Sequence, residues 1–570
     1  MIEVFRRGFV FLALLLLLAG NASSNELDAH DAELYARAFE ALDEEDFATA
    51  RALAAEARNP LPAQVIQWID LRREDTEASF LEITEFMEAH PSWPGLSELR
   101  RNAEDSAAAA DDPAAISAWF KLFPPLTGDG ALTYLDAAGE NGPGRDFVRG
   151  AWVKLDFTPE AERLFLTGYG HLLTRDDHAA RLDRLLWDEQ DEAAERMLRR
   201  VDRDQAALGF ARLTLARRKP GVDGAIARVP PSLRDHPGLW YERLRWRRRK
   251  GRDEAARSIL LDPPTDLVRP YLWARERDIL ARRALSRGSY SEAHRLTDNH
   301  GMERGIHFAD AEFLSGWIRL AFLRDNEDAL AHFERLYAGV RFSISRSRGA
   351  YWAGRAAEAK GDDLLARSWY EQAAVHPTTF YGQTALHRLR RQPPPLQPRP
   401  ASPPAARNAF EELELVRVVR MLHRLDQGKL LRPFLTRLGM QAPLTEIDQA
   451  LVAELALEVG RPREAIFVAK WALKGELDLR RYSYPLWPLP RETDGPPEPA
   501  LLLGLMRQES GFDTYVTSSA GAMGMMQVLP STARRMARDL GLGYNIERLI
   551  DDPDYNIRLG TAFLAELLVQ

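Results

Sequence analysis

Residues 317–333 read WIRLAFLRDNEDALAHF, and residues 352–370 read WAGRAAEAKGDDLLARSWY. Three positions of the first stretch correspond to three of the second, namely Trp317 to Trp352, Ala329 to Ala366 and Phe333 to Tyr370. A repeat of roughly 35 residues is typical of stacked helical hairpins, because each hairpin buries its apolar face against the next. The sequence therefore predicts a solenoid of helix pairs with one continuous core.

The sequence around these stretches favours helices throughout. From Glu26 to about Arg391 the chain is rich in Ala, Leu, Arg and Glu, and strand-like alternation is scarce. A glycine followed five residues later by an alanine recurs as Gly251/Ala256, Gly288/Ala293, Gly361/Ala366 and Gly460/Ala465. Such a glycine can end one helix in the left-handed conformation, and the small alanine lets the next helix pack closely. We expect a mostly α fold with a long α-solenoid superhelix over residues 23–391, resembling tetratricopeptide repeats; whether it closes into a ring is left open.

Two features of this array allow both a structural and a ligand-binding interpretation. Its tryptophans and tyrosines are interpreted as core residues, because they recur at helical spacing. The basic run from Arg243 to Lys250 is interpreted as a solvated helix face, with binding of an anionic polymer as the alternative.

The composition excludes several classes of protein. The 570 residues are 45% hydrophobic, which excludes wholesale disorder and indicates several domains. A net charge of −8 argues against nucleic acid as the main partner. The absence of cysteine excludes disulfides, thiolate metal sites and a cysteine nucleophile. The 12 histidines are scattered and no cofactor motif is present, so we expect no cofactor and no metal site.

The first 22 residues have the pattern of an export signal. Arg6 and Arg7 precede an apolar run from Phe9 to Leu18, and small residues follow. That run is shorter than the ~20 residues of a membrane-spanning helix. We interpret residues 1–22 as a cleaved signal peptide, with an uncleaved membrane anchor as the alternative. The mature protein is then expected in the periplasm, and association with an outer membrane is left open.

Prolines divide the rest of the chain into three segments. Residues 392–407 are dominated by proline and predict an extended linker. Helical patterning over residues 408–490 predicts a small helical linker domain. The last segment, residues 491–570, is richer in Gly, Met and Ser, and it contains the candidate catalytic chemistry.

One glutamate stands at the end of an apolar helix. Residues 500–510 read ALLLGLMRQES, and Gly511 then ends the helix. Leu501, Leu505 and Glu509 are four residues apart, which predicts that they share the apolar face. Burial and the helix dipole both disfavour the ionised carboxylate, so we expect a raised pKa for Glu509. The alternative is a glutamate that simply turns to solvent at a helix end.

The residues that follow have the composition of a ligand-binding loop. Gly521 and Gly524 allow the backbone to approach a ligand closely, and Gln527 offers both a donor and an acceptor. Ser518 and Met526 lie in the same loop.

These residues carry a family resemblance. Glu509-Ser510 and Gly524-Met525-Met526-Gln527 resemble the Glu-Ser and Gly-Leu-Met-Gln motifs of soluble lytic transglycosylases. A second, independent match is YWAGRA at residues 351–356, followed by TTFYG at residues 378–382. The order of signal, superhelix, linker domain and lysozyme-like domain also resembles that family over the whole mature chain.

The resemblance implies cleavage of peptidoglycan glycan strands between N-acetylmuramic acid and N-acetylglucosamine. Glu509 would protonate the glycosidic oxygen and then act as base on the muramic acid 6-hydroxyl, which gives a 1,6-anhydro end without consuming water. Ser518 would contact the N-acetyl or peptide-bearing part of the glycan, and Met526 and Gln527 would line the site beside Glu509. We expect a monomer, and leave open whether proteins of wall synthesis are partners.

A single acid/base group fits this chemistry. Glycosidases with two carboxylates hold them about 5–5.5 Å or 6.5–9.5 Å apart. Asp513 is the nearby candidate for a second carboxylate, but Gly511 breaks the helix between it and Glu509, so we interpret Asp513 as a turn-stabilising residue. One carboxylate then suffices only if the substrate supplies the nucleophile.

The sequence departs from the family pattern in two places. The family's domain continues past the position of Gln570, so residues 491–570 are expected to form a truncated lysozyme-like domain, and Phe563 stands where the family has Tyr. Two alternatives stay open: a hydrolytic muramidase with the same site and water as the nucleophile, and a catalytically inactive helical scaffold that binds the wall.

Overall fold

The computed structural model describes residues 27–139, 142–396, 398, 401–441, 445–473, 477–490 and 497–569. Regular structure among them is helical apart from two isolated bridges, Thr517 with Met523 and Met523 with Val528. The predicted mostly α fold is confirmed. The predicted signal peptide lies outside the described residues. By contacts the chain divides into a unit 1, Met1–Ala110 with Leu396–Gln570, and a unit 2, Asp111–Pro395.

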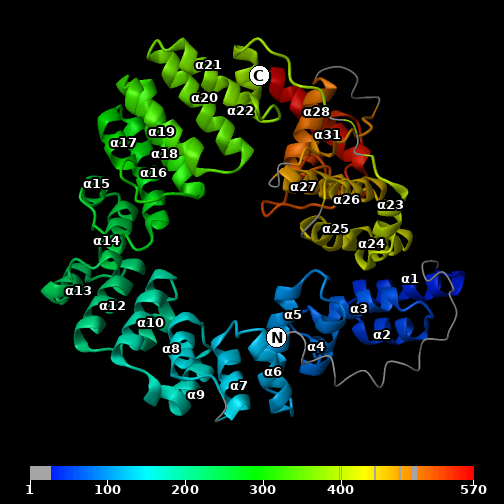
Figure 1. Cartoon of the computed structure of the whole chain (residues 1–570), viewed down its shortest axis with the longest axis horizontal. Coiled ribbons are helices and arrows are strands. Elements are labelled where there is room, and N and C mark those ends of the chain that lie inside the picture. The colour runs from blue at the N-terminus through cyan, green and yellow to red at the C-terminus, as the bar shows by residue number, and fades with distance from the viewer. Residues whose placement is uncertain are drawn as a thin grey trace. The chain divides into compact units, whose positions relative to one another are not determined.

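Unit 2 is a helical solenoid, cyan to green in Figure 1. Most successive helices pack against each other, and helices two apart also pack, as α16 does on α18 and α18 on α20. Its helices are α6 (Pro113–Leu122), α7 (Gly128–Ala138), α8 (Arg145–Lys154), α9 (Pro159–Tyr169), α10 (Arg175–Trp187), α11 (Asp191–Met197), α12 (Arg203–Ala216), α13 (Val222–Ala227), α14 (Pro237–Arg249), α15 (Asp253–Leu261), α16 (Pro270–Ser286), α17 (Tyr290–Thr297), α18 (Ile306–Ile318), α19 (Asn326–Gly339), α20 (Ser343–Ala359), α21 (Asp363–Ala374) and α22 (Phe380–Arg388).

The recurring glycine–alanine pair forms the turns of the hairpins. Gly251, Gly288, Gly361 and Gly460 have φ of +69°, +75°, +80° and +71°, directly after a helix end. The paired alanines, Ala256, Ala293, Ala366 and Ala465, are all buried in the helix that follows. A side chain would strain the left-handed turn, and a larger residue would separate the two helices, so both expectations from the sequence are confirmed.

The aromatic repeat lies in the core of the solenoid. Phe333 and Tyr370 are buried, and Trp352 packs with its ring centroid 6.0 Å from that of Phe333. Trp317 and Trp352 both pack against the buried cluster that contains Ala329 and Phe333. These residues bury the faces of neighbouring hairpins, as predicted.

The basic run of α14 differs from the prediction. Arg245 is buried and pairs with Glu242 at 3.0 Å and Glu189 at 2.9 Å. Arg248 pairs with the buried Glu276 of α16. The run is therefore not a plain solvated face, because part of it joins α14 to its neighbours through partly buried ion pairs.

Unit 1 combines the two ends of the described chain. Its first helices are α1 (Ala29–Asp43), α2 (Phe47–Glu56), α3 (Leu61–Leu71), α4 (Phe80–Ala89) and α5 (Leu96–Ala107). The later ones are α23 (Pro404–Glu411), α24 (Glu414–Arg424), α25 (Leu431–Met440), α26 (Glu446–Glu458), α27 (Pro462–Ala472), α28 (Pro499–Glu509), α29 (Pro530–Asp539), α30 (Arg548–Asp551) and α31 (Pro553–Val569).

An aromatic contact joins these two segments of unit 1. The ring of Phe434 on α25 lies 4.7 Å from that of Trp68 and 5.3 Å from that of Trp93, and all three are buried. Two polar contacts flank it. His90 Nδ1 lies 2.8 Å from Glu414 Oε1, and Arg437 Nε donates to the carbonyl of Ser92 at 3.0 Å, across 345 residues of sequence.

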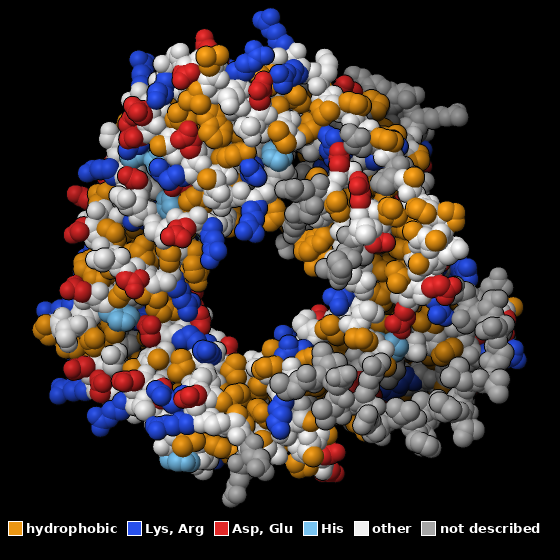
Figure 2. All heavy atoms as spheres, viewed as in Figure 1, with side chains coloured by type: hydrophobic (Ala, Val, Ile, Leu, Met, Phe, Trp, Pro, Cys, Tyr) orange, Lys and Arg blue, Asp and Glu red, His pale blue; other side chains and the backbone are white. Residues whose placement is uncertain are grey.

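The surface carries both signs of charge. Figure 2 shows basic and acidic side chains interspersed over the visible face of each unit. Many of them form ion pairs, such as Arg388 with Glu358 at 2.7 Å. Among the described residues, no helix is both long enough and apolar enough to cross a membrane.

Candidate active site

Glu509 is the last residue of α28 and is exposed to solvent. The buried side chains of this helix are Leu502 and Met506, and the next residue on that stripe, Ser510, is buried as well. Leu501 is 41% exposed. The prediction that Glu509 lies on the buried face was therefore wrong by one position, because leucines occupy 501, 502 and 503 in succession and do not fix the stripe.

Ser510 attaches the end of α28 to the glycine-rich loop. Its Oγ donates to the carbonyl of Met525 at 2.7 Å and lies 3.1 Å from that of Met506. The chain then reverses through Gly511 and Phe512, both with positive φ, and Phe512 is buried. The carboxylate of Glu509 thus stands on a helix end that is held against the loop by a buried hydrogen bond.

The loop is built around Asn556 of α31, whose side chain is fully buried. Asn556 Nδ2 donates to the carbonyls of Met523 and Leu549, each at 2.9 Å, and its Oδ1 accepts from the backbone N–H of Met526 at 2.9 Å. Gly524 has a φ of +71°, and a Cβ there would overlap both Asn556 Nδ2 and the Leu549 carbonyl. Only glycine fits this position, which is why the motif contains it.

Ser518 and Gln527 lie on the same loop, and both make hydrogen bonds inside it. Ser518 Oγ accepts from the backbone N–H of Ala522 at 3.0 Å. Gln527 Nε2 donates to the carbonyls of Gly524 at 2.9 Å and Val516 at 3.2 Å. These contacts orient both side chains, while their predicted contacts with a glycan stay predictions.

Met526 is placed differently from its neighbour Gln527. Its side chain is buried in the core of the segment, against the position of Gly560 on α31, where a Cβ would overlap it. Met526 is therefore part of the core beneath the loop. The predicted role of Met526 in lining a substrate site stays a prediction.

Asp513 serves the turn, as predicted. Its Oδ1 accepts from the backbone N–H of Tyr515 at 3.1 Å, and its Oδ2 accepts from Arg463 of α27 at 2.9 Å. Arg461 lies 3.8 Å from the same carboxylate, which is buried. Because its oxygens are held by these groups, Asp513 is an anchor between the linker helices and the loop.

A pocket of about 720 Å³ opens beside this anchor. Its lining combines cationic side chains of the linker segment, Lys429, Arg432 and Arg461, with the carboxylates of Glu547 and Asp551. The loop contributes further lining residues. It is lined by Lys429, Arg432, Arg461, Asp513, Tyr515, Val516, Thr517, Met523, Ile546, Glu547, Ile550 and Asp551.

A buried carboxyl group lies close to one of these cationic side chains. Glu464 of α27 is 3% exposed, and its Oε1 is 3.9 Å from Arg432 Nε. Burial raises the pKa of Glu464, nearby Arg461 lowers it, and the charge of Asp513 raises it further. Glu464 does not line the pocket, so it contributes to the electrostatics of the wall rather than to its surface.

The sequence pattern of the transglycosylase SLT domain matches residues 492–570, the segment that contains Glu509 and its loop. Residues 492–570 form a transglycosylase SLT domain. This confirms the resemblance to lytic transglycosylases that the Glu-Ser and Gly-Met-Met-Gln motifs indicated.

Curated relatives match this chain over part of their length. A membrane-bound lytic murein transglycosylase C of Actinobacillus pleuropneumoniae is 38% identical over 108 residues, which are 18% of this chain and 29% of that protein. The soluble lytic murein transglycosylase of Escherichia coli is 36% identical over 63 residues, 11% of this chain and 10% of that protein. The chain thus spans less than a third of the length of these relatives.

Solved structures match the fold over nearly the whole chain. The 70-kDa soluble lytic transglycosylase in complex with bulgecin A has a TM-score of 0.69 at 17% identity, covering 95% of this chain and 87% of that one. An inactive glutamate-to-glutamine mutant of a lytic transglycosylase from Pseudomonas aeruginosa has a TM-score of 0.69 at 19% identity, covering 94% and 87%. At these identities the likeness shows the fold.

Sequence reasoning missed several residues that build the site. The sequence motifs did not indicate Asn556, although its side chain holds three backbone groups of the loop. Arg463, Lys429 and Arg432 lie in the linker segment, and nothing in their local sequence indicates that they approach the loop. The one signal that could have indicated Asn556 is its place on an apolar helix face, because a buried asparagine there needs hydrogen-bond partners.

Proposed function

We propose that this protein is a lytic transglycosylase that cleaves peptidoglycan between N-acetylmuramic acid and N-acetylglucosamine and leaves 1,6-anhydro ends. The observation that carries the proposal is the contrast between two carboxylates. Glu509 is exposed at the end of α28, whereas Asp513 is buried and held by Arg463 and the Tyr515 backbone. Of these two carboxylates only Glu509 is available, which suits a reaction in which the substrate supplies the nucleophile.

In this reaction Glu509 first donates its proton to the glycosidic oxygen, and the bond between that oxygen and the anomeric carbon breaks. The carboxylate then accepts the proton of the muramic acid 6-hydroxyl, whose oxygen bonds to the anomeric carbon of the same sugar. Glu509 thus regains the proton that it donated, and no water is consumed. Ser518, Met526 and Gln527 are the proposed substrate-binding residues, and no metal or cofactor takes part.

The family resemblance supports the remaining assignments. Murein is named in the curated relatives, one of them membrane-bound and one soluble, which supports action in the periplasm after removal of residues 1–22. We expect the protein to act on glycan strands as a monomer. Attachment to an outer membrane and contacts with wall-synthesis proteins are left open. In the Pseudomonas aeruginosa structure the mutant with glutamine in place of glutamate is named inactive, which supports an essential glutamate.

The test is digestion of purified sacculi, with mass spectrometry of the released muropeptides. We expect products that lack one water, and we expect Glu509→Gln to abolish them with the fold intact. Glu498→Gln is the matched control, because Glu498 is an exposed glutamate at the other end of the same helix. Turnover retained in Glu509→Gln contradicts the role of Glu509, products with reducing ends favour a muramidase, and intact sacculi favour the wall-binding scaffold.

A further inference from the structure

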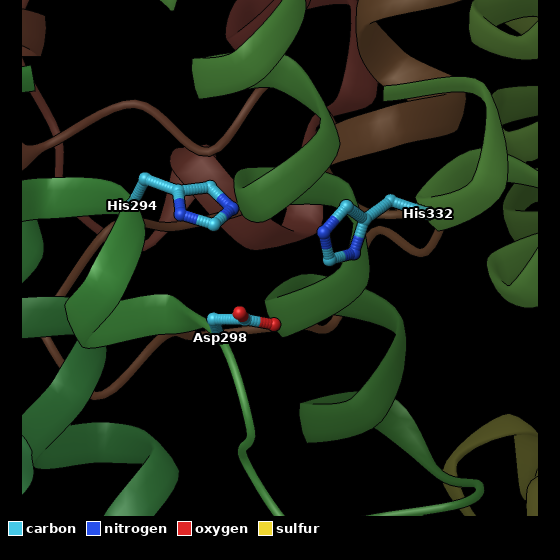
Figure 3. A group of neighbouring side chains, drawn as sticks. All are labelled: His294, Asp298 and His332. Atoms are coloured by element: carbon cyan, nitrogen blue, oxygen red, sulfur yellow. The ribbon is translucent and has the colours of Figure 1, made fainter. Parts of the chain in front are cut away.

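A second cluster of chemistry-bearing side chains lies in unit 2. Within the described part of the chain, His294, Asp298 and His332 are placed to share a metal ion, since one ligand atom from each lies within 4.8 Å of the others. Both histidines are buried and Asp298 is half-buried. Figure 3 shows the two imidazole rings facing each other, with the carboxylate of Asp298 beside the gap between them.

The last turn of α17 fixes two of the three side chains. His294 lies on α17 and Asp298 caps its C-terminus, four residues later, so both project from one side of the helix end. The backbone N–H of Asp298 donates to the carbonyl of His294 at 3.0 Å. Arg277 of α16 donates to the carbonyls of Leu296 at 2.9 Å and Asp298 at 3.4 Å, which holds this turn against the preceding helix.

A buried carboxylate orients the third side chain. Glu312 of α18 lies with its Oε2 2.7 Å from Nδ1 of His332, and Arg335 approaches the same carboxylate at 3.2 Å. A terminal nitrogen of Arg335 lies 2.7 Å from the same Nδ1. Zinc binding through Nε2, on the side facing His294, requires the proton of His332 on Nδ1, toward Glu312. A carboxylate behind the non-ligating nitrogen is the arrangement that orients metal-binding histidines.

A cationic group already contacts the lone pair of His294. Arg319 begins a π-helical turn, η4 (Arg319–Leu323), and its Nε donates to Nε2 of His294 at 2.6 Å. The guanidinium also pairs with Asp325, and with Asp328 at 2.6 Å. A metal ion at the cluster would replace the single hydrogen bond to His294, while Arg319 keeps both of its carboxylate partners.

We propose that His294, Asp298 and His332 bind one Zn²⁺ ion, in competition with Arg319. Two imidazoles and one carboxylate, with a water as fourth ligand, are a donor set typical of Zn²⁺. Ligand atoms around tetrahedral zinc, at bonds of about 2.0–2.1 Å, are roughly 3.4 Å apart, so ligand atoms that now lie within 4.8 Å of one another must approach by up to about 1.4 Å. The ion joins α17 to α19, which belong to successive hairpins, and so clamps two neighbouring repeats of the solenoid.

The test is calorimetric titration of the whole chain with ZnCl₂ after chelator treatment. We expect one ion per chain, and visible d–d absorption of a tetrahedral site when Co²⁺ replaces Zn²⁺. Asp298→Asn and His332→Gln are each expected to weaken binding by at least about 10–100-fold, the loss known for supporting residues alone. Asp298→Asn preserves shape and half-exposure, so it remains informative where the buried His332→Gln variant fails to fold.

Arg319→Met should change the zinc affinity in the opposite direction, which distinguishes this site from adventitious binding. Without the charge-assisted hydrogen bond to His294, zinc binding is expected to tighten by roughly tenfold. His171→Gln is the matched control, because His171 is an exposed histidine of the same unit, and it should leave binding unchanged. Absence of stoichiometric binding, affinity unchanged in Asp298→Asn, or weaker binding in Arg319→Met would each overturn the proposal.

Discussion

Replacing Gly524 by alanine tests whether the loop beside Glu509 is held in one conformation by close packing. Gly524 has a φ of +71°, which costs a residue with a Cβ about 1–2 kcal/mol. The new Cβ also overlaps Asn556 Nδ2 and the Leu549 carbonyl, which adds about 1–3 kcal/mol of overpacking. Loss of one Asn556 hydrogen bond adds about 1 kcal/mol, so we expect the loop to lose about 3–6 kcal/mol in total.

Hydrogen exchange followed by mass spectrometry measures this loss at the loop itself. The backbone N–H of Met526 is bonded to Asn556, and that of Val528 to the Met523 carbonyl, so both report opening of the loop. At 1.4 kcal/mol per tenfold, exchange should accelerate by at least about 10²-fold in Gly524→Ala.

Gly521→Ala provides the control for backbone strain alone. Gly521 has a φ of +81°, but a Cβ there meets nothing within 4 Å. It should cost only about 1–2 kcal/mol, or roughly tenfold in exchange. Equal effects of the two substitutions would refute the packing argument, and no effect of Gly524→Ala would refute the whole account of the loop.

Two further predictions concern the aromatic contact of unit 1 and a buried carboxylate of unit 2. Phe434→Ala should cost about 3–5 kcal/mol and make the first helices of unit 1 susceptible to proteolysis, whereas Phe380→Ala, at a residue 75% exposed, should do neither. Asp177 of α10 accepts hydrogen bonds from Arg149 and from the N-cap of that helix. Burial raises the pKa of Asp177, but these hydrogen bonds outweigh the effect of burial and lower the pKa to about 2. Because the pKa is lower in the folded state, ionised Asp177 stabilises the fold above the unfolded value of 3.8, and this stabilisation is lost as pH falls toward 2. In denaturant unfolding, Asp177→Asn should therefore cost about 1–2 kcal/mol at pH 7 and roughly half of that at pH 3. A cost of Asp177→Asn that is the same at both pH values would contradict the assignment to Asp177.

The sequence predicted those parts of the fold that depend on neighbours along the chain. The Gly251/Ala256 pattern is local, since the glycine ends one helix and the alanine starts the contact of the next, and both follow from backbone conformation and side-chain size. The family motifs likewise located the loop around Gly524. Such features need no knowledge of distant contacts.

The sequence did not predict features that depend on which distant segments meet. The buried face of α28 was misplaced by one residue, because leucines at 501–503 satisfy more than one helical stripe until the partner surface is known. The contact of Phe434 with Trp68 and Trp93 joins the two ends of the described chain, and neither end shows it alone. For the same reason the sequence did not predict the cluster of His294, Asp298 and His332, since the two histidines approach each other only when two hairpins stack.

The aromatic contact in unit 1 also sets an order of events in folding. Arg437 and Ser92 are bonded across 345 residues, so at 5–20 residues per second the first segment waits roughly 17–70 s for its partner to be synthesised. During that time the solenoid between them can fold through local contacts, but Trp68 and Trp93 lack the Phe434 surface that buries them. The earliest helices to be made are therefore among the last to be completed, and slow synthesis or early interruption leaves an exposed aromatic surface on an otherwise folded chain.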